Sequence, residues 1–176
     1  MNNNNTANKS RKVALAGILT ALAVLLLFLG SLFDILDLAS AAMGSLVILV
    51  AMIELGNGWA LGVYAAASVI SLLILPHKLP ALVFAAFSGY YPVLKKPLNK
   101  IKPKFLSYIA RIAIFNVFFF VALFMATKLL GEVFEYEYLS YVFAILSNIT
   151  FVIFDFAIER LAIFYAVKIK PKFTKH

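Results

Sequence analysis

Six long apolar segments, separated by short polar connections, are the feature that most constrains this chain. They cover residues 13–33, 38–53, 59–75, 79–94, 105–130 and 139–167. Hydrophobic residues make up 64% of the 176 residues and charged residues 14%, against about 45–50% and about 25% in soluble domains. A helix of about 20 apolar residues crosses the hydrocarbon core of a bilayer. The sequence therefore predicts an all-α, polytopic membrane domain of six transmembrane helices over residues 13–167.

The charged residues are segregated along the chain and predict its topology. Basic residues gather at 9–12, 95–104 and 168–175, whereas acidic residues mark the connections at 34–37 and 132–137. Short basic loops stay in the cytoplasm. We therefore expect a multi-pass protein of the cell membrane with both termini cytoplasmic, a disordered tail over residues 1–12 and a basic tail over residues 168–176. Because the charge of +8 flanks apolar segments, the partner it indicates is the lipid bilayer and not nucleic acid.

The second and fourth segments leave the number of spans open. Each has about 16 residues, short of the roughly 20 that an upright span needs, so both could be re-entrant or distorted. Without them, four spans would keep the same charge pattern. We favour six because the GNG sequence at 56–58 and the prolines at 76 and 80 are compact turn signals between apolar segments.

Small residues recur at helical spacing in two segments. Ala14, Gly17 and Ala21 share one face of the first segment, and Gly58 and Gly62 begin a similar stripe in the third. Small side chains let helices approach closely in lipid. One interpretation is packing within this chain. The other is that the face of the first segment docks a separate membrane subunit.

Two asparagines lie deep in the fifth and sixth segments. At about 1.5 Å per residue, Asn116 is about 16 Å from the cytoplasmic side and Asn148 about 14 Å from the outer side. In a core of about 30 Å these depths coincide, and the short connection makes the two helices antiparallel neighbours. The two carboxamides either bond to each other or, together with Ser147 and Thr150, line a cavity for a polar ligand.

Two opposite charges fall inside the same pair of segments. The same arithmetic places Arg111 about 9 Å and Asp155 about 6 Å inside the cytoplasmic boundary. An ion pair between them is the prediction. Snorkelling of Arg111 to the interface and a proton-linked role for the pair are the alternatives.

The catalytic inventory of the chain is small. It has no cysteine, and its two histidines, His77 and His176, have no further ligand at metal-binding spacing. No GxxxxGK[ST] loop occurs, so the chain cannot hydrolyse ATP by itself, and neither HExxH nor GxSxG is present. The sequence predicts a protein that is not an enzyme and needs neither a cofactor nor a metal.

Size, topology and one motif carry a family resemblance. About 180 residues, six short spans, cytoplasmic ends and the face of Ala14, Gly17 and Ala21 resemble the S component of energy-coupling-factor transporters. Gly17 and Ala21 correspond loosely to that family's Ala-x-x-x-Ala docking motif. The resemblance implies a site for a small, vitamin-like solute towards the outer side, and uptake driven by a transmembrane coupling subunit and two ATPases.

A second resemblance gives the alternative. Size and topology are also similar to the rod-shape-determining membrane proteins, which are small scaffolds of cell-envelope complexes. Usage rich in lysine and asparagine is compatible with a bacterial source for either family.

Overall fold

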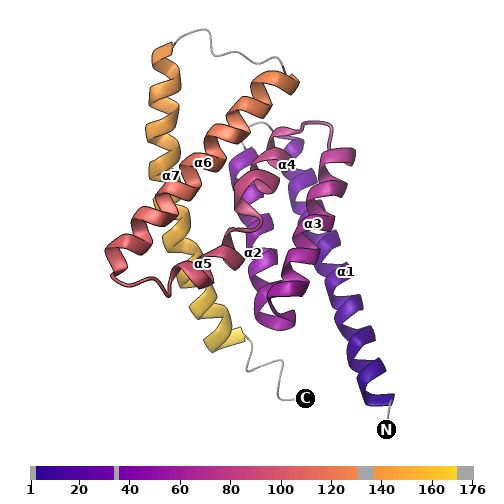
Figure 1. Cartoon of the computed structure of the whole chain (residues 1–176). Helices are drawn as coiled ribbons and strands as arrows, with labels where there is room; N and C mark the ends of the chain where they lie inside the picture. Colours follow the sequence, from indigo (N-terminus) through magenta and orange to yellow (C-terminus); the bar gives the residue numbers. More distant parts are fainter. Residues whose placement is uncertain (1–2, 34–35, 131–136, 170–176) are drawn as a thin grey trace. The chain divides into compact units, whose positions relative to one another are not determined.

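The computed structural model describes residues 3–33, 36–130 and 137–169, and every element in these ranges is helical. The connections that hold Asp34, Glu132 and Glu135, and the tail after residue 169, lie outside the described residues. The elements in chain order are α1 (Asn3–Ser31), α2 (Asp37–Leu55), α3 (Asn57–Ile74), α4 (Leu79–Val83), η2 (Phe84–Ser88), α5 (Tyr91–Leu98), α6 (Lys104–Leu130), α7 (Glu137–Phe164) and η3 (Tyr165–Ile169) (Figure 1). They divide into two compact units, Met1–Leu94 and Lys95–His176, so that α5 begins in the first and ends in the second.

The prediction of an all-helical chain is confirmed for the described residues, whereas the six crossings stay a prediction. Four stretches there are long and apolar enough to cross a membrane: Ala7–Ser31, Asp37–Leu55, Asn57–Ile74 and Lys104–Val121. The second of them has 19 residues, more than the apolar run alone suggests, because the helix continues into the polar residues at both of its ends. The helix α7 has 28 residues.

The first unit is built on three long helices. α1 packs against α2 and α3, and these two form a hairpin (Figure 1). Gly56 joins them with a φ of 94°, a left-handed conformation that glycine adopts without strain. On α1 the buried side chains recur at steps of four and face α2 and α3: Leu19, Ala23 and Leu27. This spacing is that of one helix face, so α1 contributes a single stripe to the core.

Close contacts between helices in this unit occur at three other glycines. A Cβ at Gly30 would lie 2.0 Å from the Ser40 hydroxyl, and one at Gly44 would lie 3.1 Å from the Phe84 ring. At Gly89 the added atom would lie 2.6 Å from the Tyr64 ring. The sequence pattern had singled out Gly17, Gly58 and Gly62 for close packing, yet an added Cβ there meets no described atom within 4 Å.

The fourth apolar segment is not one continuous α-helix. It consists of α4, the π-helix η2, a turn at residues 89–90 and α5. Gly89 N–H donates to the Phe84 carbonyl at 2.9 Å, five residues back, which is the π-helical pattern. The widened turn frees the Ala85 carbonyl, and the Tyr64 hydroxyl donates to it at 2.5 Å. Of the two interpretations of this segment, distortion is the one that the backbone shows.

The N-terminal region differs from its prediction. Disorder was expected over residues 1–12, but α1 already begins at Asn3. Once the apolar part of a helix is formed, extending it by one residue costs far less than starting a new helix. Lys, Arg and Ala, which occur between residues 7 and 12, are also good helix formers.

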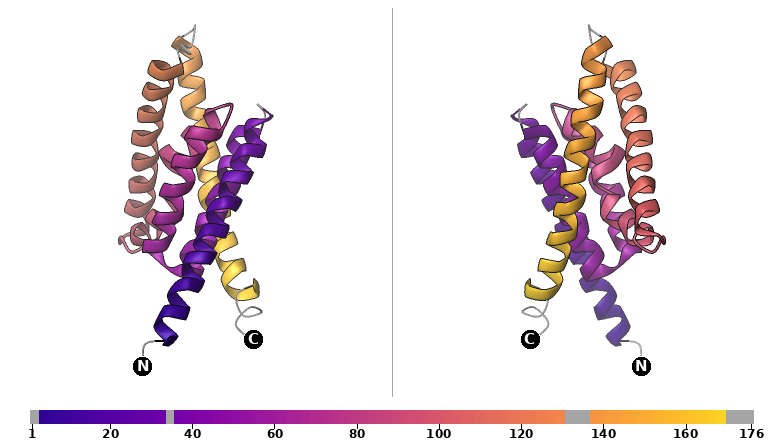
Figure 2. Two further views of the ribbon diagram at one scale, coloured as in Figure 1. Left: turned by 90° about the vertical axis from the view of Figure 1, so that its right-hand side faces the viewer. Right: turned by 90° about the vertical axis from the view of Figure 1, so that its left-hand side faces the viewer.

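The second unit is dominated by two long helices. α6 has 27 residues and α7 has 28, and they run in opposite directions and cross each other (Figures 1 and 2). The buried rings of Phe115 and Phe151 stack between them, with centroids 4.5 Å apart and an interplanar angle of 9°. Phe119 lies beside Phe115 at 5.9 Å. Aromatic packing therefore joins the two helices on the side of α7 that carries Asp155.

Candidate functional site

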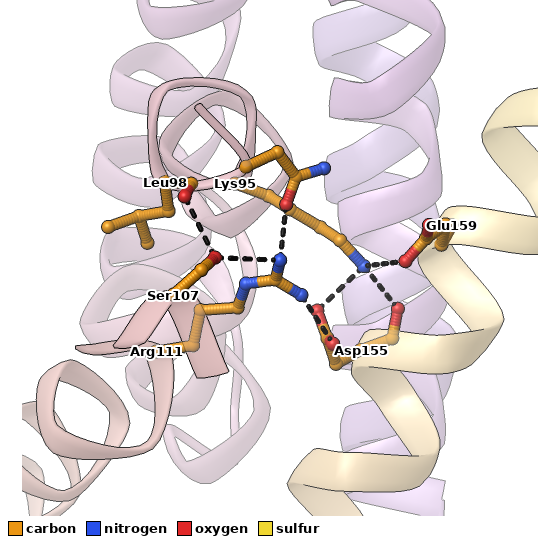
Figure 3. A network of polar contacts seen from close by, with 7 residues as sticks. Lys95, Leu98, Ser107, Arg111, Asp155 and Glu159 are labelled. Carbon is orange, nitrogen blue, oxygen red and sulfur yellow. Dashed lines mark hydrogen bonds and ion pairs between the residues drawn. The ribbon is translucent and has the colours of Figure 1, made fainter. Parts of the chain in front are cut away.

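A buried ion pair joins α6 and α7, at the residues that the depth arithmetic paired. Arg111 Nη1 lies 2.9 Å from Asp155 Oδ2 and donates a hydrogen bond to it (Figure 3). Both residues are buried. Snorkelling of Arg111 to an interface does not describe this side chain, because its guanidinium is directed to a neighbouring helix within the unit.

Lys95, from the end of α5, shares the same carboxylate. Its Nζ lies 2.7 Å from Asp155 Oδ1 and donates to the main-chain carbonyl of Asp155 at 2.6 Å. It also lies 3.3 Å from Glu159 Oε2, one helical turn further along α7 (Figure 3). The cluster thus holds two cations and two carboxylates, so its formal charges balance.

Uncharged groups hold the guanidinium of Arg111 from its other side. Nη2 donates to the Asn99 side-chain oxygen and, at 3.1 Å, to the Ser107 hydroxyl. Ser107 in turn donates to the Leu98 carbonyl at 2.8 Å, and the guanidinium lies 4.8 Å from the centre of the Tyr108 ring. The same arginine therefore ties α7 to the chain segment between α5 and α6.

Burial decides what this cluster can be. Lys95, Arg111 and Asp155 are 5–6% exposed, whereas the Glu159 side chain is 48% exposed. Isolated charges at such burial would shed their charge or find partners, because each loses several kcal/mol of hydration. Three buried charges that pair with one another form a network that joins α5, α6 and α7. We call Lys95, Asn99, Ser107, Arg111, Asp155 and Glu159 the charge network.

Sequence reasoning missed Lys95 as a member of this network. It was counted with the basic loop at 95–104, as one of five similar lysines. The one sequence signal for a second cation is the spacing of Asp155 and Glu159, which places two carboxylates on the same face of α7 against one arginine. Nothing in the sequence distinguishes Lys95 from Lys96 as the residue that supplies it.

The two deep asparagines also meet. Asn116 Nδ2 donates to Asn148 Oδ1 at 2.9 Å, and Asn148 Nδ2 donates back to Asn116 Oδ1 at 3.1 Å. Asn116 additionally donates to the Ile112 carbonyl at 2.8 Å on its own helix. This reciprocal pair corresponds to the interpretation in which the two carboxamides bond to each other. A solute that used these amides would replace the hydrogen bonds that they make with each other.

The third residue of the expected ligand site lies elsewhere. Thr150 is exposed, and its hydroxyl donates to the Leu146 carbonyl of α7 at 2.9 Å. Threonine commonly makes this bond inside helices, where the carbonyl four residues back is within reach. The described contacts therefore bring Asn116 and Asn148 together without adding Thr150 to them.

The small-residue face of α1 is open. Ala14, Gly17 and Ala21 are all exposed, and they lie away from the stripe of Leu19 and Ala23 that packs in the core. Packing within the first unit, which was one of the two interpretations, does not use this face. The three residues remain candidates for contact with another helix in the bilayer.

The described part of the chain holds no group of three or more His, Cys, Asp or Glu side chains that could bind a metal ion. Its one histidine, His77, lies 3.7 Å from Asp37, which begins α2. The polar interactions described for α6 and α7 are hydrogen bonds and ion pairs. Comparison with known proteins finds no matching family model, no matching curated protein and no matching solved structure.

Proposed function

We propose that this chain is the membrane-embedded, substrate-binding subunit of an uptake system for a small, vitamin-like solute. It acts by binding and not by catalysis, and separate partners, a transmembrane coupling subunit and ATPases, supply the energy. The observation that carries the proposal is the open face of Ala14, Gly17 and Ala21 on a helix whose opposite side is packed. In lipid, such a face gains its stabilisation from close contact with a second helix.

The proposed topology has six crossings with both termini in the cytoplasm. Four of the crossings are the stretches with span length, the fifth is the broken segment at residues 79–94, and the sixth is α7. A broken helix is tolerated at membrane depth where neighbouring groups bond its freed carbonyls, as Tyr64 does for Ala85. Labelling of a cysteine introduced at position 100 tests this topology, because reagent should reach it only from the cytoplasmic side. Labelling from outside intact cells would contradict it.

The solute site proposed here uses Asn116 and Asn148. Ligand sites are mostly apolar cavities with a few well-placed polar groups, and this amide pair lies on helices that carry the ring pair of Phe115 and Phe119. A solute with an amide or hydroxyl group would take the place of one asparagine as the hydrogen-bond partner of the other. The purified chain should then gain thermal stability with one member of a vitamin panel, by about 2.7 kcal/mol at one hundred times the dissociation constant.

The docking face provides a matched pair of variants. Gly17 on α1 and Gly62 on α3 are both exposed with open space beside them, so leucine fits at either position within this chain. Gly17→Leu should abolish assembly with the coupling subunit and uptake while solute binding persists. Gly62→Leu should leave assembly, uptake and binding unchanged. Normal uptake in the Gly17 variant would reject the docking proposal.

A scaffold of a cell-envelope complex is the second candidate, and the closed asparagine pair favours it. Because Asn116 and Asn148 satisfy each other, they need no solute. A scaffold should show no stabilisation by any solute and should co-purify with envelope proteins. The thermal panel and the co-purification therefore separate the two functions on one preparation.

A further inference from the structure

The basic segment at residues 95–104 contains two kinds of lysine. Lys95 is buried and directed into the charge network (Figure 3). The other four, Lys96, Lys100, Lys102 and Lys104, are exposed. No acidic residue occurs in the sequence between Glu54 and Glu132, so the neighbouring sequence supplies no carboxylate to neutralise them. We call these four residues the exposed lysines.

The charge network holds the turn between α5 and α6, which carries Lys100 and Lys102. Arg111 donates to Asn99, and Ser107 donates to the Leu98 carbonyl, so two side chains of α6 bind the turn. Backbone bonds from Lys100 N–H to the Pro97 carbonyl and from Ile101 N–H to the Leu98 carbonyl, both 3.1 Å, complete it. A turn that is already ordered loses less entropy when it binds a ligand than a mobile loop does.

The exposed side chains of the helix that follows favour a position of the exposed lysines at a membrane surface. Its first two turns expose large apolar and aromatic side chains: Phe105, Leu106, Tyr108 and Ile109. These side chains favour lipid over water, and aromatic rings next to lysines are typical of the interface between hydrocarbon and headgroups. The lysine ammonium groups then lie at the level where lipid phosphates lie.

We propose that the exposed lysines form a binding site for the headgroup of an anionic phospholipid. Charge complementarity identifies the ligand class, since four exposed cations lie in a stretch of sequence without acids, and phosphates carry the opposite charge. The adjoining apolar surface receives the acyl chains, which distinguishes a phospholipid from a free phosphate. Lys95 takes no part in this binding, because Asp155 and Glu159 already pair with it.

Native mass spectrometry of the full chain in dodecyl maltoside, with equal amounts of phosphatidylglycerol and phosphatidylcholine, tests the proposal. The wild-type chain should bind phosphatidylglycerol about fivefold or more in preference to phosphatidylcholine. The variant K96Q/K100Q/K102Q/K104Q should bind the two lipids within about a factor of two. The corresponding variant with four arginines should keep the preference, because it retains the charges.

A control elsewhere on the chain distinguishes a site from general attraction between charges. The variant K9Q/R11Q/K12Q removes three exposed cations from α1 and should leave the preference unchanged. If the quadruple variant does not fold, the double variants K96Q/K100Q and K102Q/K104Q replace it. Each removes two of the four exposed lysine charges and should reduce the preference for phosphatidylglycerol. An equal loss of preference in the α1 variant, no preference in the wild type, or displacement of bound lipid by glycerol 3-phosphate at millimolar concentration would overturn the proposal.

Discussion

Asp155→Asn removes the carboxylate that two buried cations share, while it preserves the size of the side chain. Lys95 keeps its bond to the main-chain carbonyl of residue 155, and Arg111 keeps its bonds to Asn99 and Ser107. Lys95 also keeps Glu159 as a partner, whereas Nη1 of Arg111 loses its carboxylate acceptor. What changes is the charge of the network, from zero to +1.

The size of the effect follows from the distances. At 2.7 and 2.9 Å, each ion pair contributes about 6 kcal/mol of direct attraction at an effective dielectric constant of about 20. Desolvation of the three buried groups offsets most of this attraction, and loss of one partner from a buried pair typically costs about 3–5 kcal/mol. Since other acceptors remain, we expect a loss of about 3 kcal/mol, the lower end of that range.

Unfolding by sodium dodecyl sulfate in mixed micelles, followed by far-UV circular dichroism, measures this loss. Glu159→Gln is the matched control, because it removes a carboxylate from the same network at a half-exposed position. It should cost no more than about 1 kcal/mol. In the double variant Arg111→Gln with Asp155→Asn, the charges of Lys95 and Glu159 remain and cancel. Its free energy of unfolding should exceed that of the single Asp155 variant by about 1 kcal/mol or more.

Two results would refute this reasoning. One is a loss below about 1 kcal/mol for Asp155→Asn, which would place the network in water and not in a buried site. The other is a double variant whose loss equals the sum of the two single losses, since independent residues behave additively.

Further variants test three of the contacts described above. Gly30→Ala should lower the thermal midpoint clearly, because the added methyl would overlap a serine hydroxyl of α2, whereas Gly17→Ala meets open space and should be neutral or stabilising by up to about 1 kcal/mol. Asn116→Ala and Asn148→Ala should each lower the free energy of unfolding by about 0.6–1.7 kcal/mol. In a double-mutant cycle, the double variant should lose no more stability than one single variant does. Phe115→Leu removes the ring stack at 4.5 Å but keeps an apolar side chain, and should cost about 1 kcal/mol in the same unfolding assay.

Residue pairs on α6 and α7 were within reach of sequence reasoning. Two long helices joined by a short connection have one antiparallel register, so the depth of each polar residue in its segment predicts its partner. Arg111 with Asp155 and Asn116 with Asn148 are the pairs that result. The same arithmetic could not find Lys95, because its position depends on how residues 79–98 break into α4, η2 and α5.

Small residues show a second limit of sequence reasoning. The spacing of Gly17, Gly58 and Gly62 is the pattern of close helix packing, but none of them packs closely within the described residues. Gly30 and Gly44 do, because Ser40 and Phe84 happen to face them. Which glycine lies under a neighbouring side chain depends on the rotation of each helix about its axis, and spacing along one helix carries no information on that rotation.

The residues of the charge network are synthesised in an order that bears on membrane insertion. Lys95 and Arg111 precede Asp155 by 60 and 44 residues, so the ribosome completes both cations before their counter-ion exists. At about 5–20 residues per second, that interval lasts about 2–12 seconds. During it, α6 carries an uncompensated arginine that hydrocarbon disfavours. In a bilayer, we therefore expect the segment between residues 95 and 111 to stay at the membrane surface until α7 has been synthesised.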